Sequence, residues 1–174
     1  PDDKREVCRN DEIRNNIIYR TGRDYYGSCG IAAGYPEGLK IEHNVIRDNP
    51  YSGISVGYGW TAEPNAMKNN VIAHNKISDV MNLLADGAAI YTLSLQPGTR
   101  ITGNYITDMK KSAWSGRSPI VGIYLDEATG GTEENPFVVK ENFIEEPRGR
   151  RFNFHSIGRV VLDNNFMYRG QKGE

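Results

Sequence analysis

The sequence lacks the features of membrane, nucleic-acid-binding and metal proteins. No run of about 18 apolar residues is present, so no segment is long enough to span a membrane. The formal net charge is -1 with both signs interspersed, which argues against nucleic acid or an anionic membrane as a partner. The three histidines, His43, His74 and His155, share no cluster with metal-ligand spacing, so we expect no metal and no other cofactor.

Cysteine and helical patterning are also scarce. Cys8 and Cys29 form no C-x-x-C motif, and we expect two buried or half-buried thiols, with a disulfide as the alternative. The polar N-terminus has no apolar stretch of the kind found in signal peptides. Only the segment Ser78–Gly87 has a pattern that could hold one or two helical turns.

The sequence does contain an eight-residue phrase in six copies, each with asparagine in its fourth position. The copies read IRNNIIYR, IEHNVIRD, IAHNKISD, ITGNYITD, VKENFIEE and LDNNFMYR. The asparagines are Asn16, Asn44, Asn75, Asn104, Asn142 and Asn165, at steps of 28, 31, 29, 38 and 23 residues. Repeats of this length are typical of solenoids.

The phrase reads as strand, turn and strand. Asparagine tolerates the left-handed conformation of a sharp corner, and identical asparagines on successive coils can hydrogen-bond as a ladder. A further strand follows in each coil, in the copies CGIAAGY, SGISVGY, AAIYTLS, VGIYLDE and the weaker RRFNFHS. We therefore predict an all-β fold, a right-handed parallel β-helix of about six coils with three short strands per coil.

The domain organisation follows from this repeat. Residues 1–174 are predicted to form a single β-helix domain. Neither terminus has an evident amphipathic cap, and an open solenoid end exposes strand edges. We expect the chain to be part of a longer protein, or to be capped by another chain.

Alternation along this further strand predicts which side chains point inward and which outward. The inward pairs are Ile31/Ala33, Ile54/Val56, Ile90/Thr92, Ile123/Leu125 and Phe152/Phe154. Three outer columns are expected: a nearly bare one of Gly30, Gly53, Ala89, Gly122 and Arg151; then Ala32, Ser55, Tyr91, Tyr124 and Asn153; then Gly34, Gly57, Leu93, Asp126 and His155.

This outer surface resembles a sugar-binding face. Tyrosine rings can take the apolar side of a pyranose, while carboxylate, asparagine and histidine groups take its hydroxyls. Asp126 and His155 should lie on neighbouring coils, about 5 Å apart. The predicted substrate-binding residues are Tyr91, Tyr124, His155, Glu127, Trp60, Asn153 and Arg151.

Structural roles remain open for several of these residues. Tyr91 and Tyr124 could simply cover the sheet, and Trp60 could anchor its loop. Asp86 could support the turn in which it lies.

Three strings resemble bacterial β-helix glycoside hydrolases: PYSGISVGYGW, DVMNLLADGAAIYTLSLQPGTRITGNYITD and GIYLDEA. The nearest family that we identify is glycoside hydrolase family 141, which includes α-L-fucosidase and xylanase activities. The resemblance covers about residues 10–170, which correspond to the central coils of longer proteins. It implies a carbohydrate substrate and two catalytic aspartates, Asp86 and Asp126.

The repeat itself supports Asp126 better than Asp86. The two aspartates are expected at opposite ends of neighbouring strands, over about 20 Å apart along extended chain. Paired carboxylates in glycosidases lie roughly 5 to 10 Å apart. Either a loop brings Asp86 back over the strand, or another acid such as Glu127 is the partner.

Two other functions compete with glycoside hydrolysis. A polysaccharide lyase or uronate epimerase could use Arg148, Arg150 and Arg151 to meet a uronate. A non-catalytic, carbohydrate-binding β-helix segment would need no paired acids. For any of the three, a polymeric substrate leads us to expect a periplasmic or extracellular location.

Overall fold

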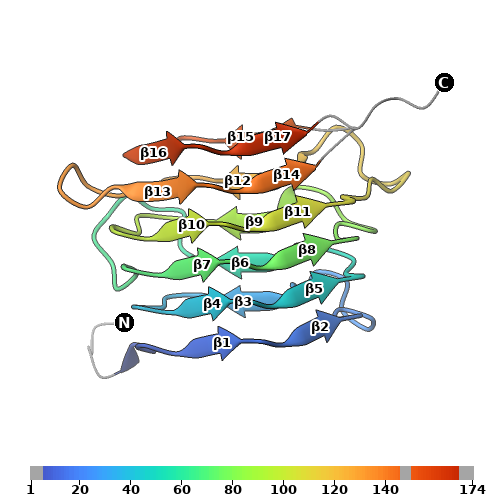
Figure 1. The fold of residues 1–174 in the computed structure, drawn as a ribbon, viewed down its shortest axis with the longest axis horizontal. Coiled ribbons are helices and arrows are strands. Elements are labelled where there is room, and N and C mark those ends of the chain that lie inside the picture. Colours follow the sequence, from blue (N-terminus) through green and yellow to red (C-terminus); the bar gives the residue numbers. More distant parts are fainter. Residues whose placement is uncertain (1–5, 146–149, 169–174) are drawn as a thin grey trace.

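The computed structural model describes residues 6–145 and 150–168, which form three parallel sheets wound into a β-helix (Figure 1). The first sheet contains β1 (Glu12–Arg14), β4 (Lys40–Glu42), β7 (Val71–Ala73), β10 (Arg100–Thr102), β13 (Phe137–Lys140) and β16 (Val160–Asp163). The second contains β2 (Ile17–Tyr19), β5 (Val45–Arg47), β8 (Lys76–Ser78), β11 (Tyr105–Thr107), β14 (Phe143–Glu145) and β17 (Phe166–Tyr168). The third contains β3 (Ile31–Ala33), β6 (Ile54–Val56), β9 (Gly87–Thr92), β12 (Ile120–Leu125) and β15 (Arg150–Phe154).

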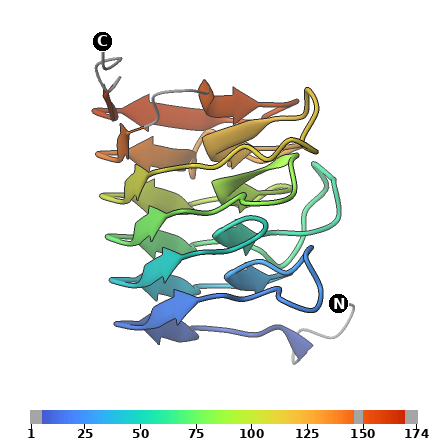
Figure 2. The ribbon, with the colours of Figure 1, turned by 90° about the vertical axis from the view of Figure 1, so that its right-hand side faces the viewer.

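Each coil adds one strand to the edge of each sheet, and every neighbouring pair is parallel and in register. Ile41, for example, pairs with Ile13 on one side and Ile72 on the other. The coils stack one above another in both views (Figures 1 and 2). The prediction of an all-β, right-handed parallel β-helix with six coils is confirmed.

The asparagine ladder is confirmed along the whole stack. The side-chain Nδ2 of each repeat asparagine donates to Oδ1 of the next, over 2.9 to 3.0 Å from Asn16 to Asn165. The backbone N–H of each asparagine donates to the same oxygen. The ladder thus joins every coil to the next through the side chain and the main chain together.

The left-handed residue of the corner is not the asparagine. The residue before it has the positive φ, between 46° and 64° in all six coils: Asn15, His43, His74, Gly103, Glu141 and Asn164. The prediction that asparagine supplies the corner conformation was therefore wrong, and its role is the ladder. The rings of His43 and His74 stack at these corners with centroids 5.1 Å apart.

The core is a set of isoleucine columns inside the coil. Ile41, Ile72 and Ile101 of the first sheet and Ile46, Ile77 and Ile106 of the second are fully buried. The predicted inward residues Ile54, Ile90 and Ile123 of the third sheet join the same cluster. Each coil therefore buries apolar side chains against both the coils above and below it and the opposite sheets.

The column that was predicted to be bare and outward-facing points inward instead. A Cβ added at Gly30, Gly53 or Gly122 would lie 2.7 to 2.8 Å from the side chain of Ile46, Ile77 or Ile144, respectively. Val121 and Tyr124 face outward and Ile123 faces inward, so the strand bends and two consecutive residues face the core. The small residues let the third sheet approach the second closely at this bend.

Two further expectations were tested by the structure. The segment Ser78–Gly87 contains no helical turn, because β8 ends at Ser78 and an irregular loop leads to β9. Cys8 and Cys29 are both free, so the disulfide alternative does not hold; Cys29 is half-buried as expected, but the expectation for Cys8 was wrong, because it is exposed. Within the described ranges, no helix is long and apolar enough to cross a membrane.

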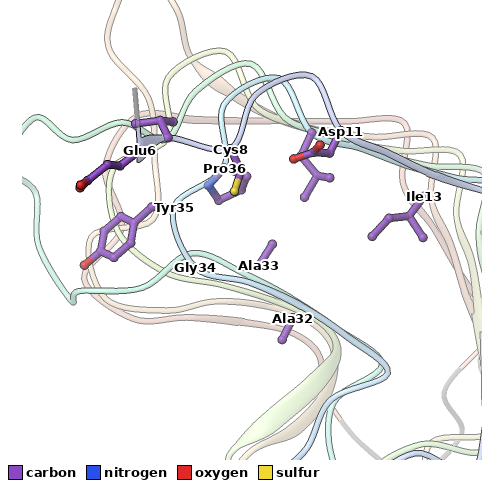
Figure 3. Close-up of a pocket in the computed structure, with 11 residues that line it drawn as sticks. Glu6, Cys8, Asp11, Ile13, Ala32, Ala33, Gly34, Tyr35 and Pro36 are labelled. Carbon is purple, nitrogen blue, oxygen red and sulfur yellow. The ribbon is translucent and has the colours of Figure 1, made fainter. Parts of the chain in front are cut away.

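The first coil opens into a cavity of about 750 Å³ at the N-terminal end of the stack (Figure 3). Ile13, Ala33 and Leu39 line it from the core side, and Glu6 and Cys8 line it from the leading segment. The cavity exists because the interior columns end at this coil.

Replacing Asn104 with Ala should strongly destabilise the stack. The change removes the acceptor of the buried Asn75 N–H and the donor to the Ile72 carbonyl. Each unsatisfied buried group costs about 1 to 3 kcal/mol, so we expect a loss of roughly 3 kcal/mol or more, measured by urea unfolding. Asn16→Ala is the control and should cost under about 1 kcal/mol, since Asn16 is an exposed ladder end. Equal losses would contradict the ladder's role.

Gly122→Ala should destabilise the fold by about 1 to 3 kcal/mol, because its Cβ would lie 2.7 Å from the Ile144 side chain. The matched control is Gly34→Ala on the same sheet. Among the described residues, its Cβ would meet only the Tyr58 Cβ, at 4.0 Å, so the change should alter stability by under about 0.5 kcal/mol. Identical thermal midpoints for the two variants would show that position 122 faces solvent.

Candidate functional site

The predicted site residues gather on the outer face of the third sheet. Parallel register places Tyr91 of β9 beside Tyr124 of β12, and Tyr124 beside Asn153 of β15. The two tyrosine rings pack edge to face, with centroids 5.2 Å apart. They cover Ala88 and Val121, which form a small apolar cluster on the outside of the coil.

Asp126 is the most constrained carboxylate on this face. It directly follows β12, and its N–H donates to the Thr92 carbonyl over 3.0 Å. The Tyr91 hydroxyl donates to Oδ2 at 2.5 Å, and Nδ1 of His155 hydrogen-bonds Oδ1 at 2.8 Å. Only 9% of Asp126 is exposed. The carboxylate is thus fixed in orientation by one donor on each oxygen.

The tyrosine hydroxyls remain protonated at neutral pH. Burial is the main cause that raises the pKa of Tyr124 to about 12, and the charges of Asp126 and Asp86 add to it. A hydrogen bond with Asn153 acts in the opposite direction. Burial, together with the hydrogen bond to Asp126, also raises the pKa of Tyr91. Both phenols can therefore donate hydrogen bonds to a ligand or to a neighbouring carboxylate.

Asp86 lies just before β9, in a left-handed backbone conformation. Its φ is 61°, and its N–H donates to the Pro119 carbonyl over 2.8 Å. The residue is exposed. Aspartate tolerates the left-handed region better than most residues, and Asp48, Asp79 and Asp108 adopt it at other turns of this fold, so the conformation of Asp86 is that of a turn.

Tyr51 connects Asp86 to the tyrosines. Its hydroxyl donates to the Asp86 carbonyl at 2.7 Å, and Gly87 leaves room for its ring, since a Cβ there would lie 2.9 Å from Tyr51 Cε2. Burial chiefly raises the pKa of Tyr51 to about 12, and the neighbouring charges of Asp86 and Asp126 contribute.

The register sets how the two aspartates are arranged. Asp86 precedes the first residue of β9 and Asp126 follows the last residue of β12, so they lie at opposite ends of neighbouring strands. The Tyr51 hydroxyl contacts the Asp86 carbonyl and the Tyr91 hydroxyl contacts the Asp126 carboxylate, and the charges of both aspartates contribute to the raised pKa values of Tyr51 and Tyr124. Each aspartate is therefore contacted by a tyrosine of this face.

Two predicted site residues, Arg151 and Trp60, lie apart from this centre, and a third, Glu127, borders it. Arg151 occupies the inward column beside Gly122, and its Nε is buried without a hydrogen-bond partner, so its predicted contact with substrate does not fit its position. Trp60 lies in the loop after β6 and packs on Tyr58. Glu127 is exposed next to Asp126. Among the residues described, no group of three or more His, Cys, Asp or Glu side chains could hold a metal ion.

Comparison with known proteins agrees with this architecture. A family model described as right handed beta helix region matches residues 6–137. The chain belongs to the right-handed β-helix family. No curated protein matches the sequence.

One solved structure similar to this β-helix is titled "Glycoside hydrolase". It is 34% identical, with a TM-score of 0.87 over 95% of this chain. The match covers 26% of that chain, so the β-helix described here spans about a quarter of its length. The resemblance to β-helix glycoside hydrolases is confirmed at this level.

Sequence reasoning missed Tyr51 although it lies in the string PYSGISVGYGW. Position 51 precedes the repeated strand, and strand alternation says nothing of where a loop side chain points. The one available signal was the pairing of a bulky Tyr51 with a glycine, Gly87, at the equivalent position of the next coil.

Asp126→Asn should lower the pKa of Tyr124 from about 12, because it removes a negative charge that disfavours the phenolate. The pKa should stay above about 10, the unperturbed value, since burial is unchanged. Titration of ¹³Cζ-labelled tyrosines by NMR measures it. Asp163→Asn, an exposed change on the first sheet, should leave it unaltered; the same result for Asp126→Asn would rule out the assigned geometry.

Proposed function

We propose that this β-helix hydrolyses glycosidic bonds of a plant or microbial carbohydrate on the outer face of its third sheet. The observation that carries the proposal is Asp126, a nearly buried carboxylate held by Tyr91 and His155. Buried ionisable groups with specific partners are candidates for functional sites. Similarity to a solved glycoside hydrolase supports the reaction class.

Asp126 has the properties of the carboxylate that acts at the sugar's anomeric carbon. It either attacks that carbon or takes a proton from the water that attacks it. The bond between the anomeric carbon and the bridging oxygen breaks, and an acid gives the leaving oxygen its proton. His155 and Tyr91 orient the carboxylate, which reduces the reorganisation needed at the transition state.

Asp86 is the proposed acid. Its side chain is exposed at the start of β9, and the assignment requires its carboxyl group to reach the bridging oxygen, roughly 5 to 10 Å from the Asp126 carboxylate. The rings and hydroxyls of Tyr91, Tyr124 and Tyr51, together with Asn153, would hold the sugar between the two aspartates. For a polymeric substrate of this kind, we propose a periplasmic or extracellular location.

The lyase and epimerase alternative has less support. It depended on an arginine cluster, and Arg151 faces inward. Arg148 and the side chain of Arg150 lie outside the described residues. A non-catalytic glycan-binding role is favoured only by the placement of Asp86 and Asp126 at opposite strand ends.

Asp126→Asn should reduce turnover about 10³-fold or more while leaving thermal stability nearly unchanged. The assay measures sugar released from 4-nitrophenyl α-L-fucoside, 4-nitrophenyl β-D-xyloside, xylan and pectin. Asp86→Asn should show a comparable loss, and Asp163→Asn should behave as the wild type.

Each other outcome points elsewhere. Wild-type turnover in Asp126→Asn would sink the assignment. Full activity in Asp86→Asn alone would leave Asp126 catalytic with another acid as its partner. Release of an unsaturated, ultraviolet-absorbing product would indicate a lyase, and binding without any product would indicate a glycan-binding module.

A further inference from the structure

Three half-exposed aromatic side chains lie together beyond the ends of β3 and β6, away from the tyrosines of the candidate site. Tyr58 packs edge-on against Trp60 with centroids 4.9 Å apart, and against Tyr35 at 6.1 Å. Their exposed fractions are 40% for Tyr35, 54% for Tyr58 and 50% for Trp60. These three residues are called the aromatic ridge. Their mutual contacts fix the rings, so their open faces are already in place for a ligand.

The backbone that presents the ridge is strained. Gly57, Gly59 and Trp60 have φ values of 115°, 106° and 47°. Glycine adopts positive φ without strain, whereas for a residue as bulky as tryptophan a left-handed conformation is a genuine outlier. Gly59 also lets the Tyr35 hydroxyl approach, because a Cβ there would lie 2.8 Å from it. Such strain persists where the surroundings hold it, and it is found at ligand clamps.

The ridge is continuous with the candidate site along the axis of the β-helix. The Thr61 N–H, next to Trp60, donates to Ser94 Oγ at 2.9 Å, and the Ser94 N–H donates to the Glu127 carbonyl at 3.0 Å. Glu127 follows Asp126 directly. Val56 of β6 pairs with Thr92 of β9, which pairs in turn with Leu125 of β12. The coil of Tyr58 and the coil of Asp126 are therefore two strand spacings apart, about 10 Å along the axis.

The outward-facing side chains beside the ridge are shorter than those at the candidate site. The column that holds Tyr91 and Tyr124 in the third and fourth coils holds Ser55 and Ala32 in the second and first. Among the residues that the structure describes, and apart from the chain neighbours of Gly34, the Tyr58 Cβ alone lies within 4 Å of a Cβ built at Gly34. A ligand that leaves the tyrosines of the site would therefore meet short side chains flanked by exposed aromatic rings.

From these observations we infer that the aromatic ridge binds further sugar rings of a glycan chain that runs along the helix axis from Asp126 towards the first coil. The direction of the chain rests on the proposed function, while binding at the ridge does not. A glycan fits the ridge because each pyranose has an apolar face for an aromatic ring and a rim of hydroxyls for the polar groups around it. Because the coils of the ridge and of Asp126 are two strand spacings apart, about 10 Å along the axis alone, a ligand that contacts both is an oligosaccharide and not a single sugar.

The binding test is native gel electrophoresis through gels that contain xylan, xyloglucan or pectin. All proteins carry Asp126→Asn, so that the polymer stays intact. Trp60→Ala and Tyr58→Ala should each weaken retardation by at least about ten-fold in apparent Kd, a loss typical of a principal aromatic contact. The control is Tyr105→Ala, which removes an exposed ring from the stacked pair Tyr105 and Phe143 on the second sheet. It should leave retardation unchanged.

A kinetic test separates the ridge from the chemistry. In the otherwise wild-type protein, Trp60→Ala should raise KM for the polysaccharide about ten-fold relative to KM for a 4-nitrophenyl glycoside, with kcat on the polysaccharide little changed, because uniform binding is lost. Tyr105→Ala, on the second sheet, should leave the ratio of the two KM values unchanged.

Several outcomes would overturn the inference. These are an unretarded parent protein in all three gels, equal retardation of Trp60→Ala and its parent, or an equal effect of the Tyr105→Ala control. Retardation that depends on Trp60 in a protein with no hydrolytic activity would support the ridge and defeat the proposed function. Hydrolysis of the small glycoside with polymer kinetics insensitive to Trp60 would do the reverse.

Discussion

In-register stacking, enforced by the asparagine ladder, is the constraint on which the rest of the structure depends. The side-chain Nδ2 of each repeat asparagine donates to the asparagine of the next coil, and its Oδ1 accepts from the asparagine of the preceding coil. Register fixed at this corner also fixes the third sheet, where Tyr91, Tyr124 and Asn153 must then lie side by side. The candidate site is a column of the repeat in which short residues have been replaced by tyrosine, aspartate and histidine.

The sequence was sufficient to predict the coils, the ladder, the inward isoleucines and the contact of Asp126 with His155, because each follows from a fixed spacing. It failed where the backbone departs from simple alternation. The bend at Gly122 places both Gly122 and Ile123 on the inner face of the coil. Because Arg151 is aligned with Gly122 in the neighbouring strand, it lies in the inward column too. The corner conformation belongs to residues such as His43 and not to the asparagines. Tyr51 and the aromatic ridge lie in loops, where side-chain direction has no period.

The site shows how a solenoid can generate chemistry from repetition. The position directly after each strand of the third sheet holds glycine in the first two coils, and it holds Leu93, Asp126 and His155 in the next three. Since adjacent coils are only about 4.8 Å apart, substitutions separated by some 30 residues become direct partners. The partly buried Tyr91 then supplies a donor to Asp126 from the coil on its other side, and the carboxylate is held from both directions along the axis.

The asparagine column also gives the stack a polarity. Between the ends of the column, each Nδ2 donates one hydrogen bond to the asparagine of the next, C-terminal coil and another to a carbonyl of the preceding coil, while each Oδ1 accepts from the preceding asparagine. The bonds from amide to amide therefore all run the same way along the column and polarise one another. A coil joined in reverse would set oxygen against oxygen, so the column admits growth in one orientation only.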